Sequence, residues 1–367
     1  MIIASTTVGT VADGAGVEEE RMAFEPAERV AVGQTGLSVT RLGFGAASIG
    51  GVFDVIDEHA GLATIEHAWD LGIRYFDVAP LYGYGTSERR LGRILAGRPR
   101  DEFVLSTKVG RLVQRATEIE AGADVDRNAF GDRRDADRTE DTGFRVVFDF
   151  SRDGILRSVE ESLGRLGLDR IDILFLHDPD DHWEAAIGEA YPTLHRLRED
   201  GVVRAIGAGM NQSAMLTRFA REGDFDVFLV AGRYTLLDQD ALTDLLPTCV
   251  ERNVAVVIGG VMNSGILATP GQAGRFNYKP APVDVIDRAR RLAAVCDRHG
   301  VPLKAAAIQF PLAHPAVASV VAGVGRIEHL DDYPAAMRQV IPADLWAELR
   351  HDGLIAREAP VPSGTAG

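Results

Sequence analysis

Residues 75–85 read YFDVAPLYGYG, a short apolar run that ends on Asp77 and is followed by a turn rich in proline and glycine. Two later runs have the same form: 104–108 ends on a lysine, and 171–177 ends on a histidine. Apolar runs of this length, bounded by turn residues and separated by amphipathic segments, are typical of buried strands in a parallel sheet. The stretch 75–85 is therefore predicted to be one strand and the turn that leads into its helix.

The same alternation extends along most of the chain. Strands are expected at 39–45, 74–77, 103–108, 171–177, 202–208, 225–230, 255–260 and 317–322. Helices are expected at 59–71, 87–96, 153–166, 184–199, 212–222, 240–251, 283–299, 303–313 and 327–339. Repeated strand–helix units of this number predict an α/β fold, the closed (β/α)8 or TIM barrel. A doubly wound open sheet is the alternative, but no Gly-x-Gly-x-x-Gly turn follows the first strand.

One barrel domain is expected from residue 29 to residue 367, because α/β barrels with chains of about 250 residues or more form a single domain. Residues 1–28 show no useful periodicity and lack the basic start and apolar core of a secretory signal, so a loose N-terminal tail is predicted there. Residues 111–150 carry clustered Asp, Arg and Gly and are too long for a simple turn. Such an insertion usually lies over the active face of a barrel, where a mobile lid and a passive surface excursion both fit this composition.

The composition excludes several classes of function. The chain has 367 residues, 46% of them hydrophobic, and a net charge of −15, so phosphate backbones and anionic lipid surfaces would repel it. No apolar run is long enough to span a bilayer. Cys249 and Cys296 have no partner at metal-ligand spacing, which argues against a disulfide framework and a metal site and fits a reducing cytoplasm. We expect a cytoplasmic protein with no nucleic-acid or membrane partner.

Ionisable residues end three of the predicted strands, and all strand carboxyl ends of a parallel barrel lie on one rim. Asp77, Lys108 and His177 should therefore converge, and Tyr82 in the turn after Asp77 is placed to join them. The set suits proton transfer coupled to hydride transfer at a carbonyl. An ammonium beside a phenol lowers its pKa, so Lys108 is expected to favour the phenolate of Tyr82. Asp77 would hold Lys108, and His177 would orient the substrate oxygen.

Other interpretations of these residues stay open. An aspartate at a strand end often caps the next helix, a lysine often reaches solvent, and a tyrosine in a turn often only packs. Lys108 could form a Schiff base, as barrel lysines do in aldolases. The segment 177–182 contains His and Asp residues of the kind that bind metals, but adjacent ligands on a short loop rarely close a site, and no metal is expected. A non-catalytic nicotinamide-binding regulatory protein is a further alternative.

Several motifs indicate a known family. They are FDVAPLYG at 76–83, STK at 106–108, and the run from 153 through SLGRL at 162–166 to DILFLH at 172–177. With later segments they cover nearly all of residues 33 to 355, and on them the sequence resembles the aldo-keto reductases. The resemblance implies a (β/α)8 barrel that binds an extended nicotinamide cofactor without a Rossmann domain. It also implies a catalytic tetrad in which Tyr82 is the general acid/base and Asp77, Lys108 and His177 support it.

Further segments are similar to one branch of the family, which contains D-threo-aldose 1-dehydrogenases, L-fucose and L-galactose dehydrogenases and pyridoxal 4-dehydrogenase. They are VFDFS at 147–151, AGRYTLLD at 231–238, GGVMNSGIL at 259–267 and the residues around Leu345 and Trp346. The branch implies that an aldose such as L-fucose, L-galactose or D-arabinose is oxidised at its anomeric carbon to a lactone, with Tyr82 acting as the base. Pyridoxal oxidation and general carbonyl reduction are the alternatives at the same site.

The resemblance implies cofactor-binding residues as well. Asn211 matches the residue that holds the nicotinamide carboxamide, although Met210 and Ala231 replace a Ser and a Gln that usually assist it. Tyr234 matches an aromatic ring that stacks on the nicotinamide. The loop that wraps the pyrophosphate contains Asn263, Ser264, Gly265 and Leu267.

The end of the last strand bears on the choice between NAD and NADP. After Gly323, the helix that follows should favour an anionic phosphate at its N-terminus. The family often places a basic residue for the 2'-phosphate of NADP at the position of Gly325, whereas here the basic residue is Arg326, one position later. The sequence therefore favours NAD slightly over NADP.

The substrate pocket is expected to have apolar walls with polar tips, which suit a small molecule such as a pyranose or pyridoxal. A monomer is expected from the resemblance. The candidate lining residues are Phe53, Tyr84, Phe148 and Trp183.

Overall fold

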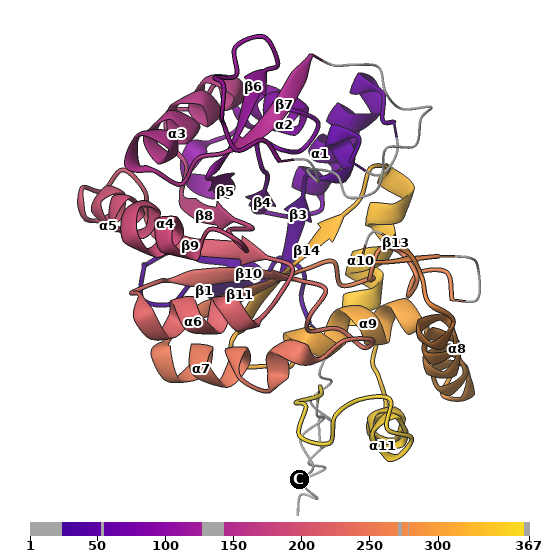
Figure 1. The fold of residues 1–367 in the computed structure, drawn as a ribbon. Coiled ribbons are helices and arrows are strands. Elements are labelled where there is room, and N and C mark those ends of the chain that lie inside the picture. Colours follow the sequence, from indigo (N-terminus) through magenta and orange to yellow (C-terminus); the bar gives the residue numbers. More distant parts are fainter. Residues whose placement is uncertain (1–23, 53–54, 127–142, 271–273, 278, 363–367) are drawn as a thin grey trace, which may run out of the picture.

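The computed structural model describes residues 24–52, 55–126, 143–270, 274–277 and 279–362 (Figure 1). Eight parallel strands close into a barrel in the order β3-β4-β5-β8-β9-β10-β11-β14, so the predicted (β/α)8 barrel is confirmed. The barrel strands are β3 (Leu42–Gly45), β4 (Tyr75–Asp77), β5 (Val104–Val109), β8 (Ile173–His177), β9 (Ala205–Met210), β10 (Val227–Ala231), β11 (Ala255–Gly259) and β14 (Val317–Gly323).

Helices surround the barrel, as Figure 1 shows. They are α1 (Glu58–Asp70), α2 (Thr86–Leu95), α3 (Arg152–Leu166), α4 (Trp183–Ala185), α5 (Tyr191–Glu199), α6 (Ala214–Glu222), α7 (Leu245–Arg252), α8 (Val283–Arg298), α9 (Leu303–Leu312), α10 (Ile327–Arg338) and α11 (Ala343–His351). A π-helical turn, Ala186–Ala190, joins α4 to α5. Each predicted helix has a counterpart here, whereas α11 is an additional element. Within the described residues, no helix has the length and apolar character that a membrane span requires.

The N-terminal end of the barrel is closed by a hairpin, of which only residues 39–40 were predicted, as the start of the first barrel strand. β1 (Arg29–Ala31) pairs antiparallel with β2 (Ser38–Thr40), and the chain then enters β3. Apolar side chains of this hairpin pack with residues near the starts of the barrel strands. The cluster includes Val32, Leu37, Val39, Val104, Ile173 and Val227. The opposite rim, where the strands end, is left for the functional site.

Residues 24–28 belong to the folded unit, which corrects part of the predicted tail. Phe24 is buried, and its N–H donates to the carbonyl of Met337 at 3.1 Å. The guanidinium of Arg41 lies 5.2 Å from the ring centroid of Phe24. An apolar side chain covered in this way contributes to the core and holds the backbone beside it. The remainder of the predicted tail, 1–23, lies outside the described residues.

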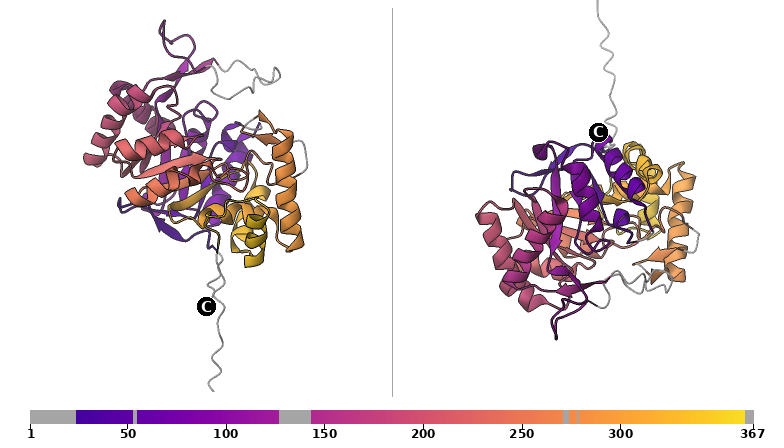
Figure 2. Two further views of the ribbon diagram at one scale, coloured as in Figure 1. Left: turned by 60° about the horizontal axis from the view of Figure 1, so that its bottom comes forward. Right: turned by 90° about the horizontal axis from the view of Figure 1, so that it is seen from above.

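The insertion at 111–150 forms a β-ribbon in its described parts, 111–126 and 143–150. β6 (Arg111–Arg115) pairs antiparallel with β7 (Phe144–Phe148) from Arg111↔Phe148 to Arg115↔Phe144. The ribbon stands out from the barrel, as the left view of Figure 2 shows. A second ribbon, β12 (Arg275–Phe276) with β13 (Lys279–Pro280), lies in the connection from β11 to α8.

Candidate active site

The residues at the ends of β4 and β5 form a buried ion pair. Nζ of Lys108 donates to Oδ2 of Asp77 at 2.7 Å and to the carbonyl of Val78 at 3.0 Å. The hydroxyl of Ser106 donates to the other carboxylate oxygen of Asp77 at 2.7 Å. Burial alone would lower the pKa of Lys108, but Asp77 and Tyr82 outweigh burial and raise it. Lys108 is therefore held as an ammonium.

This charge state bears on the Schiff-base alternative. A lysine that attacks a carbonyl must be an unprotonated amine, usually one whose pKa has been lowered. The pKa of Lys108 is instead raised, and its Nζ is engaged by a carboxylate and a backbone carbonyl. The site favours Lys108 as an electrostatic support rather than as a nucleophile.

Tyr82 lies in the turn between β4 and α2. Its N–H donates to the carbonyl of Ala79 at 3.1 Å, and Gly83 follows with a φ of +63°. A side chain at Gly83 would collide with the carbonyl oxygen of Gly50, so this tight turn requires glycine. The turn brings the phenol ring to 4.8 Å from Nζ of Lys108, measured to the ring centroid.

The pKa of Tyr82 differs from the expectation. Burial raises it, the charge of Lys108 lowers it, and Asp77 raises it again, so the net result is a pKa above the ordinary value of a phenol. The expected effect of Lys108 is present but smaller than that of burial. The phenol is thus protonated at neutral pH in this state, and its ionisation requires additional positive charge nearby.

His177 ends β8 and completes the group. Its ring centroid lies 6.2 Å from that of Tyr82, in an edge-on arrangement with an interplanar angle of 86°. Burial, Arg111 and Lys108 all lower the pKa of His177, which falls well below 6.5. A neutral imidazole has one N–H donor and one acceptor nitrogen, which suits the orientation of a substrate oxygen. The structure thus brings the four predicted tetrad side chains to one place on the rim.

The predicted cofactor residues are distributed around the same rim. Asn211 directly follows β9, and its Nδ2 donates to Oδ1 of Asp178 at 3.3 Å. Asn263 follows β11 and is buried, and its Nδ2 donates to the carbonyl of Gly232 at 3.5 Å. The Oδ1 of Asn263 has no hydrogen-bond partner among the described residues. Both amides are therefore polar groups at strand ends, where a ligand of this rim would meet them.

The loop after β11 has an unusual backbone. Asn263, Ser264 and Gly265 have φ values of +45°, +59° and +96°. Successive left-handed residues bend the chain tightly and can expose consecutive N–H groups toward an anion. The side chain of Leu267 is fully buried in the core, so this residue can meet a ligand only through its backbone.

Tyr234 does not reach the rim, which corrects its predicted role. Its side chain is 0% exposed. The ring lies against Phe310 at 5.1 Å and against His314 at 5.6 Å between ring centroids. A ring enclosed in this way has no free face on which a nicotinamide can stack. Tyr234 is a core residue that follows β10 and packs against Phe310 of α9.

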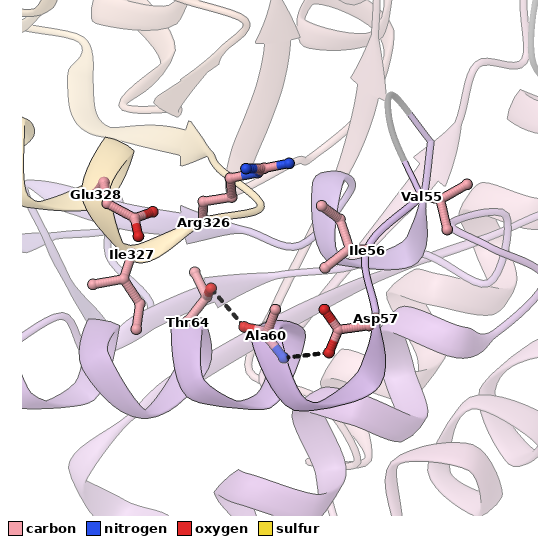
Figure 3. A pocket seen from close by; sticks show the side chains of 8 residues that line it. All are labelled: Val55, Ile56, Asp57, Ala60, Thr64, Arg326, Ile327 and Glu328. Carbon is pink, nitrogen blue, oxygen red and sulfur yellow. Dashed lines mark hydrogen bonds between the residues drawn. The ribbon is translucent and has the colours of Figure 1, made fainter.

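A pocket of about 290 Å³ lies beyond the end of β14, between the N-terminal ends of α1 and α10 (Figure 3). Arg326 precedes α10 and lines this pocket together with Asp57 and Glu328. In the view of Figure 3, the guanidinium extends toward Ile56, whereas Glu328 lies on the opposite side. Gly323, the last residue of β14, is exposed at the rim.

These features fit an extended nicotinamide cofactor. Strand register pairs Gly323 with Gly45 and Gly45 with Asp77, so the Arg326 pocket and the tetrad are two strands apart on one rim. Arg326 and the start of α10 offer positive charge to a phosphate at one end. Asn263 offers an amide after β11, the strand that neighbours β14, and Asn211 offers one after β9, further around the barrel. When bound, the nicotinamide supplies a hydride acceptor or donor.

Of the predicted pocket-lining aromatics, two are positioned by the β6–β7 ribbon. The ring of Tyr84 stacks on Phe144 with centroids 6.3 Å apart, and the ring of Phe148 lies 4.4 Å from that of His182. Trp183 is instead buried in the helix layer, where its ring lies 4.7 Å from that of Phe219, so its predicted lining role is wrong. Phe53 lies outside the described residues.

Two residues of the loop after β8, His182 and Asp178, are engaged by other protein groups. His182 contacts Oδ2 of Asp124 at 2.8 Å, and Oδ2 of Asp178 accepts a hydrogen bond from Arg111. No set of three His, Cys, Asp or Glu side chains is arranged to hold a metal in the part of the chain that the structure describes. The polar contacts of Arg111 and Asp178 beside His177 were not predicted as part of the site.

Comparison with known proteins identifies the chain's relatives. Residues 41–351 match the model of the aldo/keto reductase family. The chain is 46% identical to a D-threo-aldose 1-dehydrogenase of a Pseudomonas species, over 90% of this chain and 98% of the relative. It is 41% identical to the pyridoxal 4-dehydrogenase of Microbacterium luteolum, over 91% of this chain and all of the relative. A solved aldo-keto reductase from Bacillus halodurans superposes with a TM-score of 0.70 at 25% identity, over 91% of this chain and 97% of the other.

Proposed function

The chain belongs to the aldo/keto reductase family, and from this membership and the rim geometry we propose that it oxidises an aldose at its anomeric carbon to a lactone. The observation that carries the proposal is the Tyr82–Lys108–Asp77–His177 group at the strand ends. A relative with 46% identity is named as an aldose 1-dehydrogenase, and one with 29% identity is named as the L-galactose dehydrogenase of Arabidopsis thaliana. Both names favour a sugar hemiacetal as the substrate.

The reaction removes a hydride from C1 of the hemiacetal and a proton from its O1 hydroxyl, which leaves the C1=O bond of the lactone. The proton passes to the phenolate oxygen of Tyr82, which therefore acts as the base. Lys108 stabilises that phenolate, and Asp77 keeps Lys108 charged and in place. The neutral imidazole of His177 orients O1 by a hydrogen bond. The oxidised nicotinamide also carries positive charge, which offsets the effect of burial on the pKa of Tyr82.

The first test is a substrate panel. Purified protein with NAD or NADP is mixed with L-fucose, L-galactose, D-arabinose or pyridoxal, and reduced nicotinamide is followed by absorbance. We expect turnover of at least one aldose, with release of a lactone detectable as a hydroxamate. Turnover of pyridoxal alone would replace the sugar with the alternative substrate. Reduction of simple aldehydes without any oxidation of aldoses would indicate a general carbonyl reductase.

A non-catalytic regulatory protein on the same fold is the alternative from another functional class. Such a protein would bind the nicotinamide cofactor and turn over none of these compounds. The buried Lys108–Asp77 pair argues against this alternative, because an ion pair this deeply desolvated is costly to retain without a role. Cofactor binding followed by fluorescence, together with silence in the panel, would favour it.

We further propose that NAD is preferred over NADP. The described lining of the α1–α10 pocket contains one basic side chain, Arg326, and two acidic ones, Asp57 and Glu328. Two carboxylates disfavour the doubly charged 2'-phosphate of NADP, whereas they can accept hydrogen bonds from the ribose hydroxyls of NAD.

Arg326→Ala tests which part of the cofactor this pocket receives. Loss of one charge-assisted contact to phosphate should lower kcat/KM with NADP by about tenfold and change kcat/KM with NAD less than about twofold. The matched control is Arg338→Ala at the other end of α10, where the guanidinium pairs with Glu25 at the surface. An equal loss with both cofactors would show that Arg326 does not contact the 2'-phosphate.

A further inference from the structure

Asp178 is the first residue after β8 and is the immediate neighbour of His177. Its φ of +44° places it in the left-handed region, which aspartate enters more readily than most residues other than glycine. Its N–H donates to the carbonyl of Gly209 at 3.0 Å and so extends the β8–β9 ladder by one residue. The chain turns sharply at Asp178 while the residue remains tied to the sheet.

The carboxylate of Asp178 joins three elements of the rim. Its Oδ2 accepts from Nη1 of Arg111 on β6 at 2.8 Å, and its Oδ1 accepts from Nδ2 of Asn211 after β9 at 3.3 Å. Oδ2 also lies 3.7 Å from Nε2 of His177 at the end of β8. One side chain thus contacts the ribbon, the tetrad and the residue expected to meet the nicotinamide.

Arg111 ties this carboxylate to the ribbon. It is buried, its other terminal nitrogen pairs with Asp126, and its guanidinium lies 5.3 Å from the ring centroid of Phe148. Phe148 is the residue that pairs with Arg111 in the β6–β7 register. A planar guanidinium bonded to two carboxylates and covered by a ring has little freedom to move. The position of Asp178 is therefore fixed from the ribbon side.

The charges around Asp178 decide its state. The pKa of Asp178 is raised to about 6, because burial raises it by more than Arg111 lowers it; Asp180 raises it as well, and Lys108 and the hydrogen bond from Asn211 lower it. Above this pKa the carboxylate is ionised, and hydrogen bonds to an ionised acceptor are stronger than neutral ones. Asn211 is thus held by a charged acceptor at neutral pH.

We propose that Asp178 is a positioning residue for the cofactor, which fixes the amide of Asn211 against the ribbon anchored by Arg111. With its nitrogen donating to Asp178, the amide of Asn211 is held in one orientation at the end of β9. The inference rests on the proposed function in so far as Asn211 meets the nicotinamide. It adds a buried contact network to the tetrad and links the ribbon to the cofactor end of the site.

The test measures NAD binding without a substrate, by quenching of protein fluorescence. Asp178→Ala removes the acceptor and should raise the Kd for NAD by about tenfold, the loss expected from one charge-assisted hydrogen bond. Asp178→Asn retains an acceptor oxygen and should rescue binding to within about threefold of the wild type. An unchanged Kd in Asp178→Ala would overturn the proposal, as would equal losses in the two variants.

A double-mutant cycle shows whether Asp178 acts through Asn211. Asn211→Ala should weaken NAD binding by itself, and adding Asp178→Ala should then weaken it no further. Additive losses would mean that Asp178 contributes independently of Asn211, against the proposal. The matched control is Asp180→Asn, two positions along the same loop, where the exposed carboxylate accepts from Gln212 at 2.9 Å and NAD binding should be unchanged.

The folding of each variant is controlled by comparing its thermal unfolding with that of the wild type. If Asp178→Ala does not fold, Asp178→Ser replaces it, because the serine hydroxyl is too short to reach Asn211. NAD binding is measured without any sugar, so the coupling between Asp178 and Asn211 is obtained whether or not an aldose is turned over. If the protein oxidises no aldose but Asp178→Ala still weakens NAD binding, the proposed substrate is wrong and the proposed role of Asp178 is supported.

Discussion

Tyr82→Phe is expected to lower kcat for oxidation of the substrate by about a thousandfold, within the range that general acid–base groups contribute. The phenol ring lies 4.8 Å from Nζ of Lys108, measured to the ring centroid, and is arranged edge-on with the ring of His177. Phenylalanine keeps the ring and its packing but has no oxygen to accept the O1 proton. The measurement is steady-state kinetics at saturating cofactor and substrate, with single-turnover reduction of the nicotinamide as a check on the chemical step.

Binding separates loss of chemistry from loss of the site. The Kd for NAD should change less than about threefold in Tyr82→Phe, because the lost hydroxyl contributes to transition-state stabilisation rather than to cofactor affinity. Tyr191→Phe on α5 is the matched control, since it removes a hydroxyl that accepts from the N–H of Asp224 at 2.9 Å, far from the tetrad. Retention of more than a tenth of the wild-type kcat by Tyr82→Phe would remove Tyr82 from the role of base.

The barrel could be predicted because its strands are short, apolar and bounded by turn residues. The runs that end at Asp77, Lys108 and His177 lie within one or two residues of the observed strand ends. The topology then places these ends on one rim without any knowledge of side-chain contacts. Local signals are sufficient where the interaction is local: Ser151 directly precedes α3, and its hydroxyl accepts from the N–H of Gly154 at 3.1 Å.

Predictions failed where the decisive contact is distant in the chain. A serine at the start of a helix often caps it, but Ser87 lies inside the first turn of α2, is buried, and donates its hydroxyl to the carbonyl of Ala46 at 2.6 Å. Tyr234 was predicted to stack on the nicotinamide and Trp183 to line the pocket, but each ring packs against a phenylalanine of a helix distant in the chain. Burial by a distant element is not encoded in the spacing of neighbouring residues, so propensity and motif alone could not place these rings.

The network around Asp178 shows the same limit at the site itself. Asp178 lies beside a predicted tetrad residue, but the sequence analysis considered its segment only for metal binding and did not expect a metal there. Its partners Arg111 and Asn211 are 67 and 33 positions away. The insertion that carries Arg111 was recognised by its length, but a ribbon register that presents one guanidinium to the rim depends on tertiary contacts. A buried basic residue beginning a long insertion is the signal that could have pointed to it.

Lys108→Met should lower kcat for oxidation at pH 7 by at least about a hundredfold, since the substitution removes the cation that stabilises the Tyr82 phenolate. The sign of the pH effect follows from the base role. Oxidation requires the ionised phenol, so kcat rises with pH up to the pKa of Tyr82, and Lys108 lowers that pKa. Without the ammonium the pKa of Tyr82 rises, and the pH–rate profile should move to higher pH. The measurement is kcat against pH from 6 to about 10.5, where free phenols titrate.

Stability must be separated from catalysis in this variant, because Lys108→Met leaves the carboxylate of Asp77 buried without its cation. Breaking such a pair typically costs about 3–5 kcal/mol of unfolding free energy. The double variant Asp77→Asn/Lys108→Met removes both charges and should recover much of that stability, as measured by denaturant unfolding, while its kcat stays low. Lys304→Met on α9 is the matched control. Lys304 also pairs with an aspartate, since its Nζ donates to Asp332 at 2.9 Å, and it also lies beside a tyrosine, 4.5 Å from the ring centroid of Tyr333. A double variant that regains kcat along with stability would mean that Lys108 holds the fold at the rim and that the phenolate of Tyr82 does not depend on its charge.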